Sequence, residues 1–254
     1  MSTKKIALVT GGNRGLGKDM ALNLAKRGND VVITYNTNKD EAEGVVAAIK
    51  KSGRQAVAIQ LNTGKIDSFD SFIDTLKKSL VSDFGAESID FLVNNAGFSR
   101  SVPSLAATPV ELFDELMNVH FKGVFFLTQK LLPLINDNGG IINISSGLTR
   151  FAFPGNGTYA SMKGAVETLT KYMAKELAPR KIRANVVAPG AIATDFNGGH
   201  VRDTKQLNDT IASVTALGRV GQAEDIGSVV AFLCSDDARW ITGQRIEASG
   251  GMFL

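Results

Sequence analysis

Short apolar runs alternate along the chain with longer segments in which apolar residues recur at helical spacing. The short runs are apolar almost throughout, which is typical of strands buried on both faces of a parallel sheet. The predicted strands are Ile6–Thr10, Val31–Tyr35, Ala56–Leu61, Phe91–Asn94, Ile141–Ser145, Ala184–Ala188 and Arg245–Glu247.

Helical segments lie between most of these strands. Ala21–Arg27 and Asp40–Lys51 are each closed by a glycine, a residue that commonly follows the last turn of a helix. Thr108–Glu111 predicts a further helix start, with a capping box and Pro109 at the first helical position. Strands that alternate with helices predict an α/β fold, a doubly wound parallel sheet with helices on both faces. No linker or repeat divides residues 1–254, so a single domain is expected.

A longer helix is predicted from Thr158 to Leu177, because its apolar positions keep helical spacing until Pro179 stops it. Tyr159 and Lys163 are one turn apart, so their side chains share a face. A free tyrosine has a pKa near ~10, too high for proton transfer at neutral pH, and a neighbouring ammonium lowers it by favouring the phenolate. The pair predicts a general acid/base, although such a pair is commonly no more than two surface neighbours.

The composition is that of a globular chain with a substantial core, since 44% of the 254 residues are hydrophobic. The net charge is only +3 and the lysines are scattered, which argues against a nucleic-acid or membrane partner. We expect no signal peptide and no membrane span. Cys234, the only cysteine, is predicted to be a small buried side chain, and a reducing cytoplasm is the expected location. No residue cluster has metal-ligand spacing, so no catalytic metal is expected.

A glycine-rich turn, Thr10 to Gly17, follows the first predicted strand. Its glycines allow a tight turn and let backbone amides approach a pyrophosphate at the start of the next helix. The second strand ends without a carboxylate before Asp40, so the acidic residue that would hold the 2′-hydroxyl of NAD is missing. Arg14 can instead pair with a 2′-phosphate. The turn predicts a dinucleotide, NADP(H) rather than NAD(H), the alternative being that Arg14 is a solvated surface arginine.

Several separate motifs stand in the order and spacing of one enzyme family. They are Thr10-Gly11 to Gly17, Asn94-Asn95-Ala96-Gly97, Asn118, Ser146, Tyr159 to Lys163, Pro189-Gly190, Leu217 to Ile226 and Ser249-Gly250-Gly251. On these motifs the chain resembles the short-chain dehydrogenase/reductase family over essentially its whole length. It is similar to the 3-oxoacyl-[acyl-carrier-protein] reductases and carbonyl reductases of the same size. The resemblance implies a Rossmann-like, doubly wound parallel sheet of seven strands.

The resemblance implies a catalytic set of Asn118, Ser146, Tyr159 and Lys163. In this family Tyr159 would protonate the carbonyl oxygen, and Ser146 would donate to the developing alkoxide. Lys163 would lower the pKa of Tyr159 and hold the nicotinamide ribose. Asn118 would kink the central helix and fix a water that links Lys163 to solvent. Ser145 is left as a structural hydroxyl at the end of a strand.

The same resemblance implies the residues that hold the cofactor. In the family, the loop from Pro189 to Thr194 meets the nicotinamide carboxamide through the Ile192 backbone and the Thr194 hydroxyl. Asn62 stands where many members have an aspartate for the adenine amino group, so its contact would be uncharged. The expected cofactor-binding residues are Gly11, Asn13, Arg14, Gly15, Leu16, Gly17, Tyr35, Asn36, Asn62, Asn94, Ala96, Gly97, Tyr159, Lys163, Pro189, Gly190, Ile192 and Thr194.

The substrate side is expected to be apolar, because the family places several loop residues of this chain beside the nicotinamide. Loop phenylalanines can also be satellite core. The stretch from Asn197 to His200 resembles the start of a mobile substrate lid, expected over residues 196–216. His200 is expected on the surface or in this lid, and His120 in a structural role. The expected pocket residues are Phe98, Leu148, Phe151, Phe153 and Phe196.

The expected activity is hydride transfer between NADP(H) and a carbonyl or secondary alcohol, in the direction of carbonyl reduction. One alternative is a 3-oxoacyl-[acyl-carrier-protein] reductase, for which Arg100 and Arg150 are the candidates to hold an acidic carrier protein. Another is a non-catalytic protein that senses NADP, which would be expected to lose a member of the catalytic set. The family implies a homotetramer, with a dimer left open, and the apolar tail Gly251–Leu254 fits a subunit interface.

Overall fold

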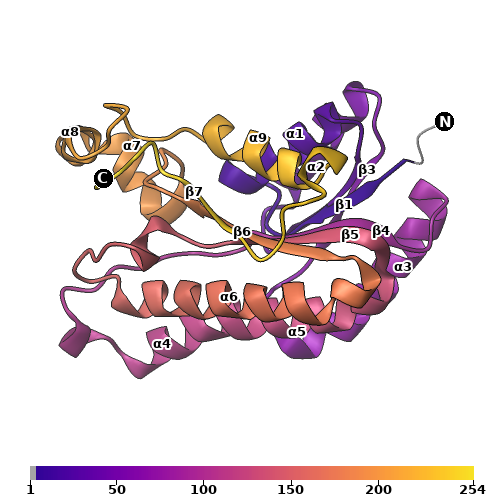
Figure 1. The fold of residues 1–254 in the computed structure, drawn as a ribbon, viewed down its shortest axis with the longest axis horizontal. Coiled ribbons are helices and arrows are strands. Elements are labelled where there is room, and N and C mark those ends of the chain that lie inside the picture. The colour runs from indigo at the N-terminus through magenta and orange to yellow at the C-terminus, as the bar shows by residue number, and fades with distance from the viewer. Residues whose placement is uncertain (1–3) are drawn as a thin grey trace.

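The computed structural model describes residues 4–254, which form one seven-stranded sheet with parallel pairing throughout. The strand order β3-β2-β1-β4-β5-β6-β7 reverses at β1, as in a doubly wound sheet (Figure 1). The predicted α/β fold class is confirmed. The strands are β1 Ile6–Val9, β2 Asp30–Tyr35, β3 Ala56–Gln60, β4 Ile89–Asn94, β5 Ile135–Ile144, β6 Arg183–Pro189 and β7 Arg245–Ala248.

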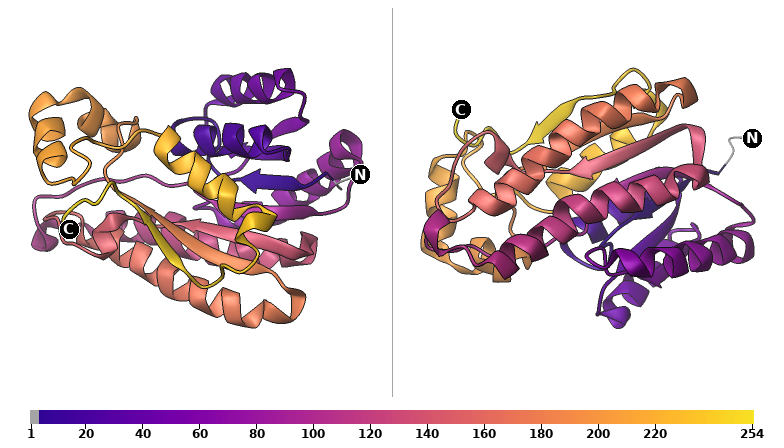
Figure 2. Two further views of the ribbon diagram at one scale, coloured as in Figure 1. Left: turned by 45° about the horizontal axis from the view of Figure 1, so that its top comes forward. Right: turned by 90° about the horizontal axis from the view of Figure 1, so that it is seen from below.

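Helices cover both faces of the sheet. One face carries α1, α2 and α9, and the other carries α3, α4, α5 and α6 (Figures 1 and 2). The short helices α7 and α8 stand beyond one end of the sheet, beside the C-terminus (Figure 1). The helices are α1 Gly15–Lys26, α2 Lys39–Lys51, α3 Phe69–Ser79, α4 Val110–Met117, α5 Gly123–Leu131, α6 Gly157–Glu176, α7 His200–Asp203, α8 Lys205–Ser213 and α9 Glu224–Leu233.

The central strands are buried on both sides because alternate residues face two separate cores. In β1, Ala7 and Val9 pack into the core under α1, α2 and α9. Ile6 and Leu8, between and beside them, pack into the core under α3, α5 and α6. The unbroken apolar runs in the sequence are explained by this arrangement, since neither face of such a strand meets water.

Several predicted boundaries differ from the structure by one or two residues, and the differences at α1, α4 and β5 are of most interest, α1 beginning at Gly15 rather than Ala21. The capping box at Thr108 does not form: α4 begins at Val110, Pro109 is its N-cap in extended conformation, and no side chain caps the helix. Thr108 is also extended, as expected for a residue before proline, so its hydroxyl is not placed over the first turn. The strand β5 begins at Ile135 rather than Ile141. Its first half is polar and contains an irregularity, with a positive φ at Asn138, so the apolar pattern in the sequence marked only its second half.

The carboxyl ends of the parallel strands lie together at one edge of the sheet. In doubly wound sheets the ligand crevice forms there, at the point where the strand order reverses. The reversal lies between β1 and β4, and the turn after β1 leads directly into α1. Within residues 4–254, no helix is both long and apolar enough to cross a membrane.

Candidate active site

A cavity of about 570 Å³ lies at this end of the sheet, and the glycine turn forms one side of it. Gly11 and Gly15 have φ of 64° and 53°, a left-handed conformation that favours glycine. A Cβ on Gly17 would lie 2.1 Å from the Gly11 carbonyl oxygen, so only glycine lets the turn close on the start of α1. The Gly11 and Gly12 amides are already bonded to Thr34, so a pyrophosphate would be met by the amides that follow them, at the start of α1.

The end of the cavity beside β2 is open to a 2′-phosphate. Arg14 is exposed, lines the cavity as the N-cap residue of α1, and has no ion pair within the described part of the chain. One carboxylate does come near, from α2: Glu41 accepts hydrogen bonds from Asn13 at 2.7 Å and from Asn38 at 3.1 Å. Two amides thus hold this carboxylate, and the arginine remains available to an anion.

Tyr159 lies in the wall of the cavity on the first turn of α6, and it is buried in an apolar cluster with Leu112, Leu116 and Met162. Burial raises the pKa of Tyr159 well above 10, and the Ser146 side chain opposes that shift only in part. The predicted lowering of this pKa by Lys163 is not borne out. Desolvation of the phenolate is the larger effect, so Tyr159 is protonated at neutral pH.

Lys163 shares the face of α6 with Tyr159, as the spacing predicts, and the hydrogen bond of its ammonium goes to the backbone. Its Nζ donates to the Ile144 carbonyl at 2.8 Å and lies 5.6 Å from the centre of the Tyr159 ring. Burial lowers the pKa of Lys163 to about 7. The lysine is therefore only partly charged at neutral pH, and its charged form is the one that can stabilise a phenolate on Tyr159.

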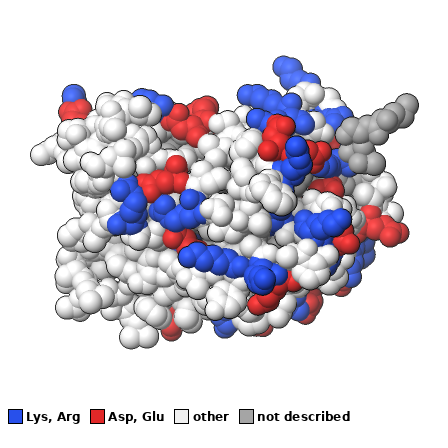
Figure 3. Space-filling model, viewed as in Figure 1, with Lys and Arg blue, Asp and Glu red and all other residues white. Residues whose placement is uncertain are grey.

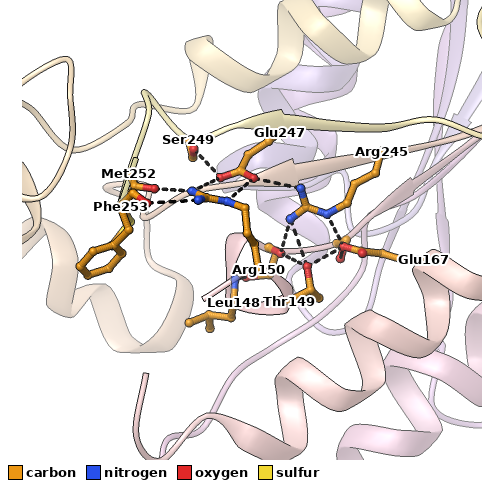
Figure 4. Close-up of polar contacts among 11 residues, drawn as sticks. Leu148, Thr149, Arg150, Glu167, Arg245, Glu247, Ser249, Met252 and Phe253 are labelled. Atoms are coloured by element: carbon orange, nitrogen blue, oxygen red, sulfur yellow. Dashed lines mark hydrogen bonds and ion pairs between the residues drawn. The ribbon is translucent and has the colours of Figure 1, made fainter. Parts of the chain in front are cut away.

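Ser146 lies in the loop after β5 and lines the cavity. Arg150 and Thr149 of the same loop belong to a network of polar and charged side chains that holds the loop (Figure 4). The carbonyl oxygen of Ser146 is 2.9 Å from Thr149 Oγ1 and 3.3 Å from Arg245 Nη2. Its Oγ accepts from the Leu148 amide at 3.2 Å, which leaves the hydroxyl proton free to donate into the cavity. The carboxylate of Glu167 completes the network by accepting from Arg245 at 2.8 Å.

Ser145 has the structural role that was expected. Ser145 lines the cavity, and its hydroxyl donates to Glu167 at 2.7 Å. Because Glu167 lies one turn beyond Lys163 on α6, this bond ties the end of β5 to the helix that carries Tyr159 and Lys163.

Neither basic side chain proposed for carrier binding is free. Arg150 pairs with Glu247 at 2.8 Å and donates to the carbonyls of Met252 and Phe253 in the C-terminal tail (Figure 4). Arg100 pairs with Glu115 at 3.4 Å, with both side chains exposed. The role proposed for Arg150 is thus taken over by an intramolecular contact that holds the tail.

A π-helical turn, Asn118–Lys122, joins α4 to α5, and in it the Gly123 amide donates to the Asn118 carbonyl. The helix is thus irregular at the place where a kink was expected, and the kink itself stays a prediction. Asn118 itself is only half-buried and does not line the cavity, whereas His120 on the same turn does. The extra residue in a π turn changes which side chains face inward, and a 3.6-residue period does not predict that change.

The other predicted cofactor residues line the cavity except for Tyr35 and Asn94. Tyr35 packs into the core beneath α2. Asn94 is buried and donates to Thr128 at 3.0 Å and to Asn143 at 2.8 Å, so it stabilises the junction of β4 and β5. The neighbouring Asn95 lines the cavity instead, because side chains alternate along an extended segment. Their roles toward a cofactor stay predictions.

Asn62, the departure from the family pattern, does line the cavity. Its side-chain oxygen accepts from the Gly64 amide at 2.9 Å, which fixes the orientation of the amide group. One of the two acceptor sites of the oxygen that was expected to meet an adenine amino group is therefore already used.

All five predicted substrate-side residues border the cavity, and the structure adds apolar residues that sequence reasoning missed. Three of them come from the predicted lid and one from the tail. Leu207 and Ile211 are four residues apart on α8, and this helical spacing was the available signal. The additional apolar residues are Val201, Leu207, Ile211 and Met252.

Three further predictions concern His200, Cys234 and the binding of a metal. His200 is exposed on α7, and Cys234 is buried with its thiol pKa raised to about 12 by desolvation. Across residues 4–254, no group of three or more possible ligands is arranged to hold a metal ion.

A family model described as Enoyl-(Acyl carrier protein) reductase matches residues 11–253. The chain is 41% identical to a protein of Staphylococcus epidermidis named 3-oxoacyl-[acyl-carrier-protein] reductase FabG, over 98% of this chain and 99% of the relative. Among solved structures, the promiscuous reductase LugOII, which catalyses keto-reduction at C1 during lugdunomycin biosynthesis, has a TM-score of 0.94 at 39% identity, covering 99% of both chains. The angucycline C-6 ketoreductase LanV with bound NADP has a TM-score of 0.93 at 38% identity, covering 98% of this chain and 96% of its own.

Proposed function

Since the chain belongs to the short-chain dehydrogenase/reductase family, we propose that it uses NADPH to reduce a bulky, apolar ketone. The observation that carries this proposal is Tyr159, buried and protonated in the wall of a largely apolar cavity that Ser146 and Lys163 also line. A protonated tyrosine is the form needed for carbonyl reduction, whereas alcohol oxidation needs the phenolate. Reduction is the direction that this arrangement favours.

NADP(H) fits the residues of the glycine turn. Gly11, Gly15 and Gly17 leave the backbone open where a pyrophosphate binds, and the N-terminus of α1 adds the partial positive charge of its dipole. Arg14 can pair with a 2′-phosphate in bidentate fashion. The bound NADP of the similar ketoreductase LanV supports the same choice.

The chemistry then divides among three side chains. NADPH supplies the hydride to the carbonyl carbon when it is bound. Tyr159 donates its hydroxyl proton to the carbonyl oxygen, and Ser146 donates a hydrogen bond to that oxygen as charge develops. Lys163, held at Nζ by the Ile144 carbonyl, provides the positive charge that stabilises the phenolate left on Tyr159.

An apolar substrate is supported by the walls of the cavity and by the surface around it. Phenylalanine, leucine and isoleucine side chains from three loops and α8 line the cavity. Around the ends of α4 and α6 nearest the lid, Figure 3 shows almost no charged side chains on the face in view. The keto-reductions of LugOII and LanV are in accord with such a pocket.

A second candidate, reduction of a 3-oxoacyl thioester on an acyl-carrier protein, is favoured by the 41% identity to FabG. The pairing of Arg100 with Glu115 and of Arg150 with Glu247 argues against it, because an acidic carrier needs free cations at the entrance. A non-catalytic NADP sensor has less support, because Ser146, Tyr159 and Lys163 line one cavity.

The test is NADPH oxidation with three substrates: a polycyclic aromatic ketone, a small activated ketone and acetoacetyl thioester, each repeated with NADH. Fastest turnover of the polycyclic ketone with NADPH is expected. Preference for the thioester would instead assign carrier-protein chemistry. Tyr159→Phe should lower kcat by about 10²- to 10⁴-fold and leave NADPH affinity unchanged; a variant with wild-type turnover contradicts the catalytic assignment.

We further propose a homotetramer in the cytoplasm, the dimer being the alternative assembly. Apolar side chains are exposed on α4, α5 and α6, including Phe113, Phe125 and Tyr172, and Trp240 and Leu254 are almost fully exposed at 96% and 95%. Such side chains support further subunit contacts. The reducing location is supported by the one buried, unpaired cysteine. Light scattering on the purified chain measures the assembly directly, and a monomer would exclude it.

A further inference from the structure

The carboxylate of Glu167 has several hydrogen-bond partners and no part in the chemistry described above. Glu167 belongs to α6, one turn beyond Lys163, and its side chain is only 17% exposed. Its Oε1 lies 2.7 Å from Ser145 Oγ, 2.7 Å from Thr149 Oγ1 and 2.8 Å from Arg245 Nε (Figure 4). Because the acceptor is ionised, these bonds are stronger than those between neutral groups, and they hold the three partners in place.

Two of the partners belong to the loop that carries Ser146. Ser145 directly precedes Ser146, and Thr149 follows it by three residues. The Thr149 hydroxyl also lies 2.9 Å from the Ser146 carbonyl oxygen, so its one proton is shared between that oxygen and Glu167. The loop is therefore bonded to the carboxylate on both sides of the serine.

Arg245 completes the arrangement from the last strand, β7. Its Nη2 donates to the Ser146 carbonyl at 3.3 Å and to Thr149 Oγ1 at 3.0 Å. Its Nη1 donates to Glu247 at 2.9 Å, so the guanidinium is fixed between two carboxylates. A guanidinium is planar and its donors have a fixed geometry, so Arg245 links the position of Glu167 to the backbone of Ser146.

Ser146 and Tyr159 must be placed accurately relative to each other, although they lie on separate elements. Tyr159 is on the first turn of α6, whereas Ser146 is in the loop after β5. Both line the cavity, and the Ser146 side chain acts on the pKa of Tyr159. Two groups that bind one carbonyl oxygen need this accuracy, because a displacement of about 1 Å can lower a rate about 10²-fold.

The helix α6 joins Glu167 firmly to Tyr159. It runs unbroken from Gly157 to Glu176, and about 12 Å of helix separates the two residues. The contacts of Glu167 with the loop therefore determine where the loop lies relative to Tyr159.

We propose that Glu167 is a positioning residue of the reductase site, which together with Arg245 sets the distance between the Ser146 hydroxyl and the Tyr159 phenol. This inference rests on the proposed function. Neither Glu167 nor Arg245 lines the cavity, so both act through the loop and neither contacts the reacting atoms.

The kinetic test measures kcat and KM for the ketone in Glu167→Leu, which removes the acceptor, and in Glu167→Gln, which keeps an oxygen. In Glu167→Leu we expect kcat to fall about tenfold, with KM and NADPH affinity unchanged. Glu167→Gln should recover most of this loss, because its amide oxygen can accept from the loop. Glu176→Leu, the same change at an exposed position of α6, is the control. Wild-type kcat in Glu167→Leu overturns the proposal.

The same change in a Ser146→Ala background separates positioning from a general effect on the fold. Ser146→Ala alone should lower kcat about 10²-fold, because it removes a donor to the developing alkoxide. If Glu167 acts through Ser146, adding Glu167→Leu should lower kcat no further. A further loss of about tenfold in the double variant overturns the proposal, since it would not pass through Ser146.

Ser145→Ala replaces Glu167→Leu in this comparison if the latter does not fold. It removes one hydrogen bond to the carboxylate and leaves the ion pair with Arg245 intact. We expect kcat to fall about threefold in the wild-type background and to be unchanged in the Ser146→Ala background. Equal losses in the two backgrounds overturn the proposal.

A second measurement needs no turnover. The chain has three tyrosines, so isotopic labelling of their Cζ carbons gives three resonances, and Tyr159→Phe identifies that of Tyr159. We expect Ser146→Ala and Glu167→Leu to shift this resonance in the same direction, and Glu176→Leu to leave it in place. An unshifted resonance in Glu167→Leu overturns the inference even if the enzyme reduces ketones. The expected shifts in a protein that reduces no ketone count against the proposed function alone.

Discussion

Arg150 and Glu247 form a two-point ion pair, with Nε–Oε2 and Nη2–Oε1 distances that are both 2.8 Å, across the space between the serine loop and the last strand. The same guanidinium donates to the carbonyls of Met252 and Phe253 (Figure 4). The tail in turn bonds to the end of the predicted lid, where the Phe253 amide donates to the Val214 carbonyl at 2.8 Å. One arginine therefore links the catalytic loop, the tail and the lid.

Arg150→Ala should release the tail and loosen the pocket wall formed by Met252. We expect KM for the ketone to rise about fivefold, which corresponds to about 1 kcal/mol for a half-exposed charged contact, with kcat within twofold of the wild type. Arg100→Ala is the matched control, because its pair with Glu115 is exposed and has no contact with the tail among its ion pairs and hydrogen bonds. An unchanged KM in Arg150→Ala would mean that the tail is held without this arginine.

The acid stability of the protein should depend on Glu247. Burial raises the pKa of this carboxyl, but hydrogen bonds from Arg150, Ser249 and Arg245 outweigh burial and hold the pKa at about 2. A carboxyl with a lowered folded-state pKa adds stability above its unfolded value near ~4.5, and this stability is lost as the pH falls toward 2. In urea unfolding, the wild type should lose about 2 kcal/mol more than Glu247→Gln between pH 6 and pH 3. Parallel losses in the two proteins would contradict this.

We expect the buried ammonium of Lys163 to lower the free energy of unfolding, although catalysis needs this side chain. Its folded-state pKa of about 7 lies below the unfolded value, so the penalty of burying the ammonium is complete below pH 7 and disappears as the pH rises toward ~10.5. Lys163→Met should therefore unfold at higher urea concentration than the wild type at pH 6. We expect its free energy of unfolding to be larger by about 2 kcal/mol, once the loss of the bond to the Ile144 carbonyl is subtracted.

The gain from Lys163→Met should shrink between pH 7 and pH 10, while ketone turnover is lost at every pH. Lys171→Met, on the same helix but exposed, is the control for the change of side chain. Equal stability of Lys163→Met and the wild type at pH 6 would show that the lysine is not a buried cation there.

Arg14 should set the preference between the two nicotinamide cofactors. Removing a charge-assisted pair with the 2′-phosphate costs about 1.5–3 kcal/mol, so Arg14→Ala should weaken NADPH binding about 10- to 100-fold and leave NADH binding unchanged. Lys18→Ala, an exposed cation on α1 that does not line the cavity, is the control. Equal weakening of both cofactors by Arg14→Ala would assign the arginine to the pyrophosphate or to folding instead.

The sequence by itself determined the features that depend on short stretches of chain. The apolar runs predicted the buried strands, because a strand buried on both sides is mostly apolar, whereas the polar first half of β5 was missed. The glycine turn and the Tyr159–Lys163 pair were equally local. A strand, a turn and a helix determine where Gly11 and Gly17 meet, and one turn of helix determines which face Tyr159 and Lys163 share.

Only the tertiary structure decided the features that join distant segments. Arg150 and Glu247 are 97 positions apart, so no local pattern shows that the arginine is already paired. The π turn places His120 in the cavity and leaves Asn118 outside its lining, a change that a regular helical period does not contain. The pKa of Tyr159 depends on desolvation by side chains from α4 and α6 together, and burial of this kind exists only once the chain has folded.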